Sequence, residues 1–205
     1  MAVQSSFKNM TLCLFAICLV CSGLLAGVYA LTKEPIELAA KAKNEAAIKE
    51  VLPETAVTIE EERTVEMSGE TYTYNLAYDQ DGNTVGCAIN VSTLGFGGPI
   101  VIKVGFDVNG IIWNTKVLSQ SETPGLGAKC VEPAFADQFR EFDAQEKKLG
   151  VKKDGGDIDA ITASTITSRA YVNGIEKAVY VFATITQTPM PLDTCTGAST
   201  NASEE

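Results

Sequence analysis

Histidine is absent from this 205-residue chain, and basic residues are scarce. Without an imidazole, the chain can form no Ser-His-Asp triad, no histidine-ligated haem or zinc site and no histidine-linked flavin. The 16 Lys and Arg against 26 Asp and Glu give a net charge of -10, which argues against the basic surface that a nucleic acid partner requires. Any redox cofactor in this protein must therefore be held by other side chains.

Cysteines with the spacing of a metal site are also missing. Three of the six cysteines lie in one apolar run near the N-terminus, and Cys87, Cys130 and Cys195 are scattered, with no C-x-x-C pair. This pattern excludes the usual iron-sulfur and structural zinc motifs. The three scattered cysteines are either small buried hydrophobic residues or, in an oxidising compartment, include one disulfide.

Residues 10–31 form an almost uninterrupted apolar run that is long enough to cross a bilayer as a helix. A cleaved signal peptide is the alternative, since Val28-Tyr29-Ala30 resembles a cleavage site, but the run is longer than the apolar part of most signal peptides. We therefore predict a short N-terminal segment at 1–9, a transmembrane helix at 10–31 and a helical neck at 32–53, which is rich in Ala, Lys and Glu.

The next part of the chain carries strand and turn signals. Strands are predicted at 71–78, 84–91, 100–107 and 111–118, with turns at 79–83 and at Asn109-Gly110. Connections this short predict an antiparallel meander.

Two helices are predicted beyond the strands. One covers 133–142, with Phe135, Phe139 and Phe142 on one side, and the other covers 165–183, with one apolar face formed by Val172, Ile175, Val179 and Phe182. We expect an α+β domain at 54–183, whose antiparallel sheet is covered on one side by helices that include 165–183. Residues 184–205, rich in Thr, Pro, Ser and Gly, predict a disordered tail.

Hydroxyl side chains cluster where the second helix begins, at Thr162, Ser164, Thr165, Thr167 and Ser168. Ser164 or Thr165 at the N-cap would accept a hydrogen bond from a free amide of the first turn. Such capping is ordinary at helix starts. The same free amides and the positive end of the helix dipole also favour a phosphate, so an anion site is the alternative.

Three segments together resemble a known family. They read Gly-Phe-Gly-Gly-Pro-Ile from Gly95, Glu-Thr-Pro-Gly-Leu-Gly from Glu122 and Asp-Ala-Ile-Thr-Ala-Ser-Thr from Asp159. In this order they resemble the FMN-binding subunits of two respiratory complexes. These are the G subunit of the Rnf ferredoxin:NAD oxidoreductase, to which the first segment is more similar, and the C subunit of the sodium-translocating NADH:quinone reductase.

The resemblance implies a covalent flavin. The family pattern Asp-x-x-Ser/Thr-Gly-Ala-Thr carries FMN as a phosphoester on its last Thr, which matches Thr165. The family's Gly-Ala pair stands here as Ala163-Ser164, which places a second hydroxyl beside the acceptor at a point where Ala takes a positive φ less readily than Gly. The other cofactor-binding residues that we predict are Thr162, Ser164, Ile166, Thr167, Glu122, Thr123, Gly125 and Leu126.

The resemblance also implies a function. It predicts an electron-transfer subunit that moves electrons between ferredoxin and NAD while its complex translocates Na+ or H+. Its partners would be integral membrane subunits, membrane lipid and a flavin transferase that takes FMN from FAD. The chain lacks a dinucleotide-binding fingerprint, so it should not oxidise NADH alone.

The same resemblance places the flavin domain on the extracytoplasmic side of the inner cell membrane, as part of a single-pass protein. The alternatives are a C-type subunit of the quinone reductase and a membrane-anchored binding domain without a cofactor. A hydrolase would need a Ser or Thr nucleophile with a defined Lys or Asp partner, and no pairing in the sequence is specific enough to name.

Overall fold

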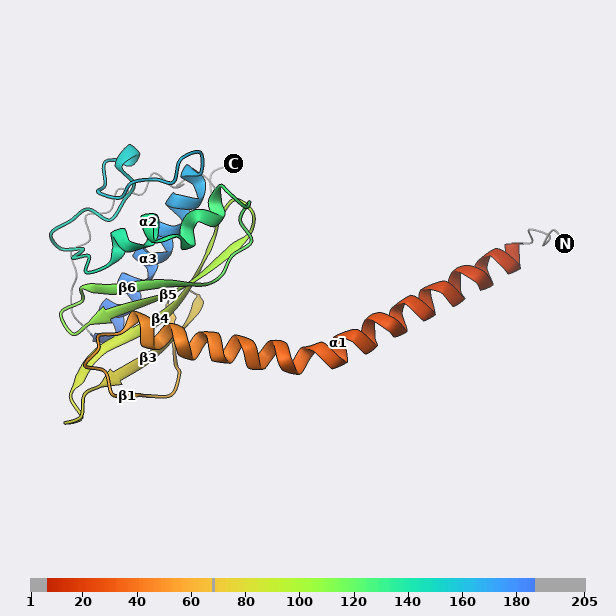
Figure 1. Cartoon of the computed structure of the whole chain (residues 1–205), viewed down its shortest axis with the longest axis horizontal. Helices are drawn as coiled ribbons and strands as arrows, with labels where there is room; N and C mark the ends of the chain where they lie inside the picture. The colour runs from red at the N-terminus through yellow and green to blue at the C-terminus, as the bar shows by residue number, and fades with distance from the viewer. Residues whose placement is uncertain (1–6, 68, 187–205) are drawn as a thin grey trace. The chain divides into compact units, whose positions relative to one another are not determined.

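The computed structural model describes residues 7–67 and 69–186 of the chain (Figure 1). It divides into two compact units, residues 1–44 and 45–205. The helix α1, Phe7–Val51, crosses this boundary and continues through Pro35. It includes the predicted transmembrane helix and all of the predicted neck except its last two residues, 52 and 53.

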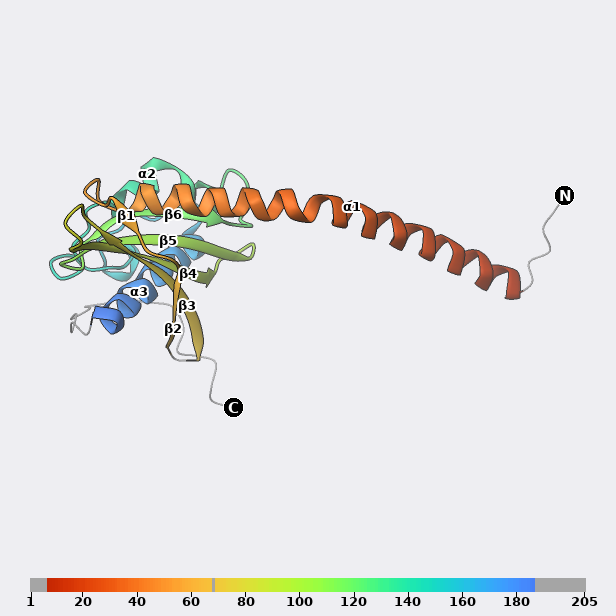
Figure 2. The same ribbon diagram turned by 90° about the horizontal axis from the view of Figure 1, so that it is seen from below.

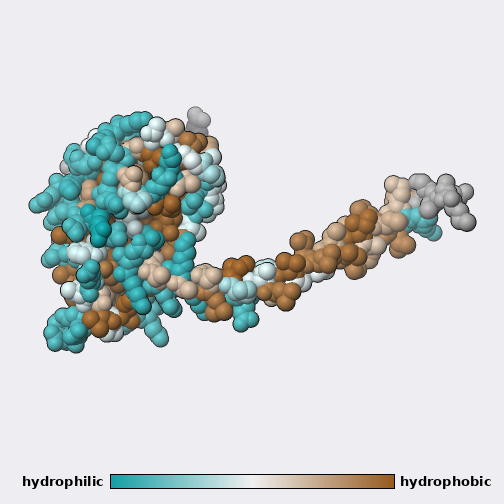
Figure 3. Space-filling view, in the orientation of Figure 1, coloured by the Kyte–Doolittle hydropathy of each residue, from teal (hydrophilic) through white to brown (hydrophobic). Residues whose placement is uncertain are grey.

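By length and composition, α1 is the one helix in the described part of the chain that is suited to cross a membrane. Its most apolar window has a mean hydropathy of 2.4, and none of that window is buried against protein. Apolar side chains cover its N-terminal part in the space-filling view (Figure 3). Exposed apolar side chains over such a length are costly in water and favourable in lipid.

Six strands form one antiparallel sheet, in the order β1-β3-β4-β5-β6 with β2 also paired to β3. Their bounds are β1 Thr58–Ile59, β2 Arg63–Met67, β3 Glu70–Tyr78, β4 Thr84–Leu94, β5 Pro99–Asp107 and β6 Ile112–Ser119. The strands β3 to β6 confirm the four predicted ones, and the Asn109-Gly110 turn joins β5 to β6. The strands β1 and β2 are not predicted from the sequence, since β1 has two residues and β2 is polar and largely exposed.

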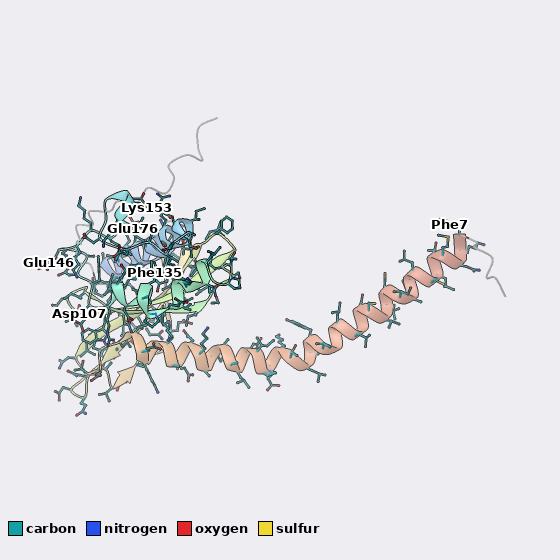
Figure 4. All side chains as sticks on the ribbon, turned by 45° about the horizontal axis from the view of Figure 1, so that its top comes forward. Phe7, Asp107, Phe135, Glu146, Lys153 and Glu176 are labelled. Atoms are coloured by element: carbon teal, nitrogen blue, oxygen red, sulfur yellow. The ribbon has the colours of Figure 1, made fainter. Side chains whose placement is uncertain are left out.

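The helical elements after the sheet are η1 Gly127–Val131, α2 Pro133–Ala136, η2 Asp137–Phe139, η3 Lys152–Asp154 and α3 Thr165–Thr186. The predicted helix at 133–142 is wrong in length, because the backbone becomes extended at Arg140 and Phe142 pairs with Ile112 beside β6. Its aromatic side chains are nevertheless buried. Phe135, which is labelled in Figure 4, and Phe139 pack on Tyr171 of α3, with ring centroids 5.2 and 5.1 Å away.

One face of the sheet packs against α3, as predicted. The four residues of the predicted apolar face of α3 are all buried, together with inward-facing residues of β4 and β5 such as Ile89 and Ile102. Phe182 stacks on Phe106 with ring centroids 4.9 Å apart. The apolar residues that recur every 3.6 positions in the helix and every second position in the strands therefore pack together in one core.

The opposite face of the sheet is covered as well, so the prediction of helices on one side only is wrong. The residues after Asn44 in α1 bring Ile48, Val51 and Leu52 against Ala77 and Ala88 in a second, smaller core. Figure 2 shows α3 and the last turns of α1 on opposite sides of the strands. The strand residues beneath α1 are small, so they give no hydrophobic periodicity from which this contact can be predicted.

Candidate functional site

The three segments that carry the family resemblance meet at one end of the domain. They are the turn between β4 and β5, the segment between β6 and η1, and the start of α3, and Figure 1 shows them together. Glu122 connects all three. Its Oε1 accepts a hydrogen bond from the Gly97 N–H at 2.9 Å, and its Oε2 accepts one from the Thr167 hydroxyl at 2.6 Å.

The segment after Glu122 is a tight turn into η1. The Thr123 carbonyl accepts bonds from the N–H groups of Leu126 and Ala128, each at 3.2 Å, and Gly125 has a φ of 77°. That left-handed conformation is one that glycine adopts at little cost. The turn leaves the Leu126 side chain 43% exposed.

The hydroxyls at the start of α3 differ sharply in exposure. Thr167 and Ser168 are buried, with exposures of 1% and 0%, and Ser164 is 8% exposed. Thr162 is exposed and Thr165 is partly exposed. A bulky group can be attached from outside only at a hydroxyl that reaches solvent, so this geometry favours Thr162 and Thr165 over the other three.

Thr165 has the surroundings of an anion site. It is the first residue of α3, and the first helical hydrogen bond runs from the Ser168 N–H to the Ser164 carbonyl at 3.0 Å. The amides of Ile166 and Thr167 therefore precede the helical ladder and are available to a phosphate. Lys153 donates from Nζ to the Thr165 hydroxyl at 3.3 Å.

The charged residues near Lys153 are arranged in pairs. Arg169 donates from two nitrogens to the Asp154 carboxylate, at 2.7 and 2.6 Å, and this contact holds the pKa of Asp154 below its usual value. Lys152 pairs with Asp159 at 2.7 Å. Lys153 instead directs its ammonium group to Thr165, where a positive charge would stabilise a phosphate.

The backbone before α3 is held in an unusual conformation. Ala163 has a φ of 61°, in the left-handed region that costs residues other than glycine roughly 1–2 kcal/mol. Ser168 stabilises the turn: its Oγ accepts the Ile161 N–H at 2.9 Å and donates to the Ser164 carbonyl at 3.0 Å. The chain thus tolerates alanine where the resembling family has glycine.

Exposed apolar side chains surround this end of the domain. The exposures are 77% for Leu94, 70% for Phe96, 43% for Leu126 and 55% for Ile166. A groove of about 1020 Å³ lies between α3 and the strands β3 and β4, and Leu94, Ile166 and Arg169 contribute to its lining. The exposed side chains of Leu94, Phe96, Leu126 and Ile166, here called the apolar rim, form an apolar surface on the segments that meet at this end of the domain.

The cysteines do not contribute to a site in the described part of the chain. Cys87 and Cys130 are buried free thiols, and burial raises their pKa values to about 12 and about 11. Cys195 lies outside the described residues. No cluster of His, Cys, Asp and Glu suited to a metal ion is found within residues 7–67 and 69–186.

Comparison with known proteins now identifies the family. The FMN-binding domain family matches residues 95–180, and the family described as the RnfG N-terminal region matches residues 1–51. The G subunit of the ion-translocating oxidoreductase complex of Shewanella piezotolerans is 34% identical over 198 residues, and the match covers 87% of this chain and 90% of that protein. The chain belongs to the family of these G subunits.

Other G subunits are similar to a comparable degree. That of Methanosarcina acetivorans is 34% identical over 166 residues, covering 78% of this chain and 86% of the relative. Among solved structures, the C subunit of the Na(+)-translocating NADH-quinone reductase from Parabacteroides distasonis aligns with 21% identity and a TM-score of 0.48, covering 73% of this chain and 85% of the other. The FMN-binding match of this chain, residues 95–180, contains all three segments of the site.

Proposed function

We propose that in this chain, an electron-transfer flavoprotein subunit of an ion-translocating oxidoreductase complex, FMN is joined to Thr165 through a phosphoester. The observation that carries the proposal is the position of the Thr165 hydroxyl. It is partly exposed at the first residue of a 22-residue helix, and a lysine ammonium group contacts it. The matching FMN-binding region supports the choice of cofactor.

The residues present fit the phosphodiester that would join FMN to Thr165. The amides of Ile166 and Thr167 would donate to its oxygens, and the positive end of the helix dipole would favour its charge. Lys153 would add an ammonium group that already lies 3.3 Å from the ester oxygen. Ser164 would contribute its carbonyl to the helix rather than its hydroxyl to the phosphate, because its side chain is buried.

The protein would position the flavin rather than supply its redox chemistry, which belongs to the cofactor when it is bound. The apolar rim would shield one side of the ring from water, and the turn at Thr123–Leu126 would offer backbone groups to its polar edge. A covalent link suits an electron carrier, because a tethered cofactor cannot dissociate between turnovers.

The place of this subunit in its complex is part of the proposal. We expect α1 to anchor it in the inner cell membrane as a single-pass protein, with residues 54–183 as the flavin domain on the extracytoplasmic side. Integral membrane subunits would be its neighbours, membrane lipid would surround its anchor, and a flavin transferase would load it. The complex would couple electron flow between ferredoxin and NAD to Na+ or H+ translocation.

Mass mapping after co-expression with a flavin transferase tests the attachment. The full chain should be purified in detergent, denatured and digested with trypsin. We expect a yellow peptide spanning residues 154–169 whose mass is increased by FMN less water, with fragmentation placing the addition on Thr165. A colourless protein, or flavin on another peptide, would contradict the proposal.

A kinetic test addresses the role of the subunit. The purified flavin-loaded protein should not oxidise NADH by itself, because the sequence has no dinucleotide-binding fingerprint. Stopped-flow absorbance of the flavin mixed with NADH gives the answer directly. Rapid bleaching of the flavin by NADH would assign this subunit a role as the NADH dehydrogenase rather than as a relay.

A further inference from the structure

A buried carboxylate lies behind the proposed flavin site. Glu122 is 6% exposed, and it connects segments that are far apart in the sequence. It accepts the Gly97 N–H from the β4–β5 turn and the Thr167 hydroxyl from the first turn of α3. Thr167 is two residues from Thr165, so this carboxylate is one hydrogen bond away from the turn that carries the acceptor.

Both glycine-rich segments pack closely around this carboxylate. A Cβ atom at Gly95 would lie 2.2 Å from Oε1, and one at Gly127 would lie 2.3 Å from Oε2. Gly97 likewise passes so near the backbone of Ser121 that a Cβ would lie 2.2 Å from its carbonyl oxygen. Because these glycines have no side chain, their backbone can approach Glu122 and Ser121 closely.

Within the described residues, the Glu122 carboxylate has hydrogen-bond donors but no ion pair with a basic side chain. Among the residues that the structure describes, no Lys or Arg forms an ion pair with Glu122. Two causes raise the pKa of the nearby Cys130 thiol. Burial is the larger, and the charge of the Glu122 carboxylate is the second. An unneutralised negative charge in a region of low dielectric acts over a longer range than one in water.

We propose that Glu122 is a positioning residue of the flavin site, which joins both glycine-rich segments to the start of α3 and places a buried negative charge beside the flavin. This inference rests on the proposed function. It revises the expectation that Glu122 contacts the cofactor, because its carboxylate points into the protein and acts through Gly97 and Thr167.

The position of Glu122 and its charge each have a consequence for the flavin site. The bonds from Gly97 and Thr167 fix the apolar rim relative to Thr165, since Phe96 and Leu126 lie on the segments that Glu122 holds. Reduction adds negative charge to a flavin, so a buried carboxylate nearby opposes it and lowers the reduction potential. Removal of the charge without loss of the contacts should therefore raise the potential.

The substitution Glu122→Gln separates charge from shape. The glutamine Oε1 can still accept the Gly97 N–H, and its Nε2 can donate to the Thr167 oxygen. In the flavin-loaded full chain, we expect unchanged loading and a reduction equilibrium shifted about tenfold toward the reduced flavin, because the negative charge that opposes reduction is removed. Spectroelectrochemical titration measures it.

Glu132→Gln is the matched control, because Glu132 is exposed and its side chain makes no capping bond to α2. It removes one negative charge from the neighbouring segment and should leave the potential unchanged. Equal potentials in the Glu122→Gln variant, the Glu132→Gln variant and the unmodified protein would overturn the electrostatic part of the proposal.

The positioning role has a readout that needs no flavin. In protein expressed without a transferase, Glu122→Ala should increase the exchange rate of the Gly97 amide by at least about tenfold, because its acceptor is lost. The Gly110 amide, which donates to Asp107 in the distant β5–β6 turn, should not change. Unchanged Gly97 exchange would overturn the positioning role, whether or not Thr165 carries FMN.

Discussion

The two sides of the first turn of α3 carry the same chemical group in opposite settings. On the outer side, the Thr165 hydroxyl reaches solvent and meets an ammonium group. On the inner side, the Thr167 and Ser168 hydroxyls are buried and fully engaged with Glu122, Ile161 and Ser164. Under the proposed function, hydroxyls two or three positions apart would therefore have separate tasks, attachment outside and support inside.

The sharpest test of this division is Thr165→Val, which keeps β-branching and volume but deletes the outer oxygen. We expect complete loss of covalent flavin, with a free energy of unfolding changed by less than about 0.5 kcal/mol, as for most surface substitutions. Denaturing electrophoresis with flavin fluorescence, together with urea unfolding, measures both quantities.

Ser164→Ala is the control for Thr165→Val. It moves the motif toward the form found in the resembling family and should keep or improve loading. Flavin that persists in Thr165→Val but disappears in Ser164→Ala would assign the attachment to Ser164 instead.

For the inner side of the turn, we expect the reverse result, which is a loss of stability without a loss of flavin loading. Ser168→Ala leaves the buried Ile161 N–H without an acceptor, which should cost about 1–3 kcal/mol of stability. Flavin loading of the folded fraction should be preserved. Chemical denaturation of the unloaded protein measures the loss, and a stable variant that cannot be loaded would mean that the two sides are not separate.

The ammonium group on the outer side should influence loading more modestly. Lys153→Gln removes a charge from the surface near the phosphate, and we expect loading about fivefold slower, in line with the roughly 1 kcal/mol upper range of exposed ion pairs. Lys153→Arg should retain most of the rate. A time course of flavin incorporation by purified transferase compares them, and equal rates for all three proteins would remove Lys153 from the site.

The smallest effect concerns the backbone that leads into the turn. Ala163→Gly relieves the left-handed conformation at a gain of roughly 0.5–1 kcal/mol, because glycine adopts a φ of 61° without steric cost but has more freedom when unfolded. Thermal unfolding should show a rise of a few degrees with unchanged loading. A lower melting temperature would show that the conformation of Ala163 is not strained.

Much of the fold follows from sequence patterns that are local. The four longer strands, their turns and the start of α3 have periodicity or turn residues that identify them. The apolar length of α1 is equally plain. The short β1 and the polar β2 carry no such signal, and the helix predicted at 133–142 fails after Phe139 because Phe142 pairs with β6.

The sequence predicts which segments form the site but not which of their side chains contact one another. The sequence indicates the hydroxyl cluster and both glycine-rich segments, and the resemblance singles out Thr165. It does not reveal that Glu122 bonds Thr167, since 45 positions separate the two and neither belongs to a periodic pattern. The approach of Lys153 to Thr165 depends on an irregular loop, where local propensity is least informative.

The packing of glycines around Glu122 has a consequence for how this protein tolerates change. A side chain at Gly95 or Gly127 would displace the carboxylate, and a shorter residue at 122 would leave the room that those glycines create unfilled. Substitutions at these positions should therefore be strongly epistatic. In a combinatorial library, Gly127→Ala should be harmful beside Glu122 and less so beside a shortened side chain such as Glu122→Ser, where the Thr167 Oγ, 2.6 Å from the added Cβ, sets the cost that remains. The two motifs therefore act as one structural unit.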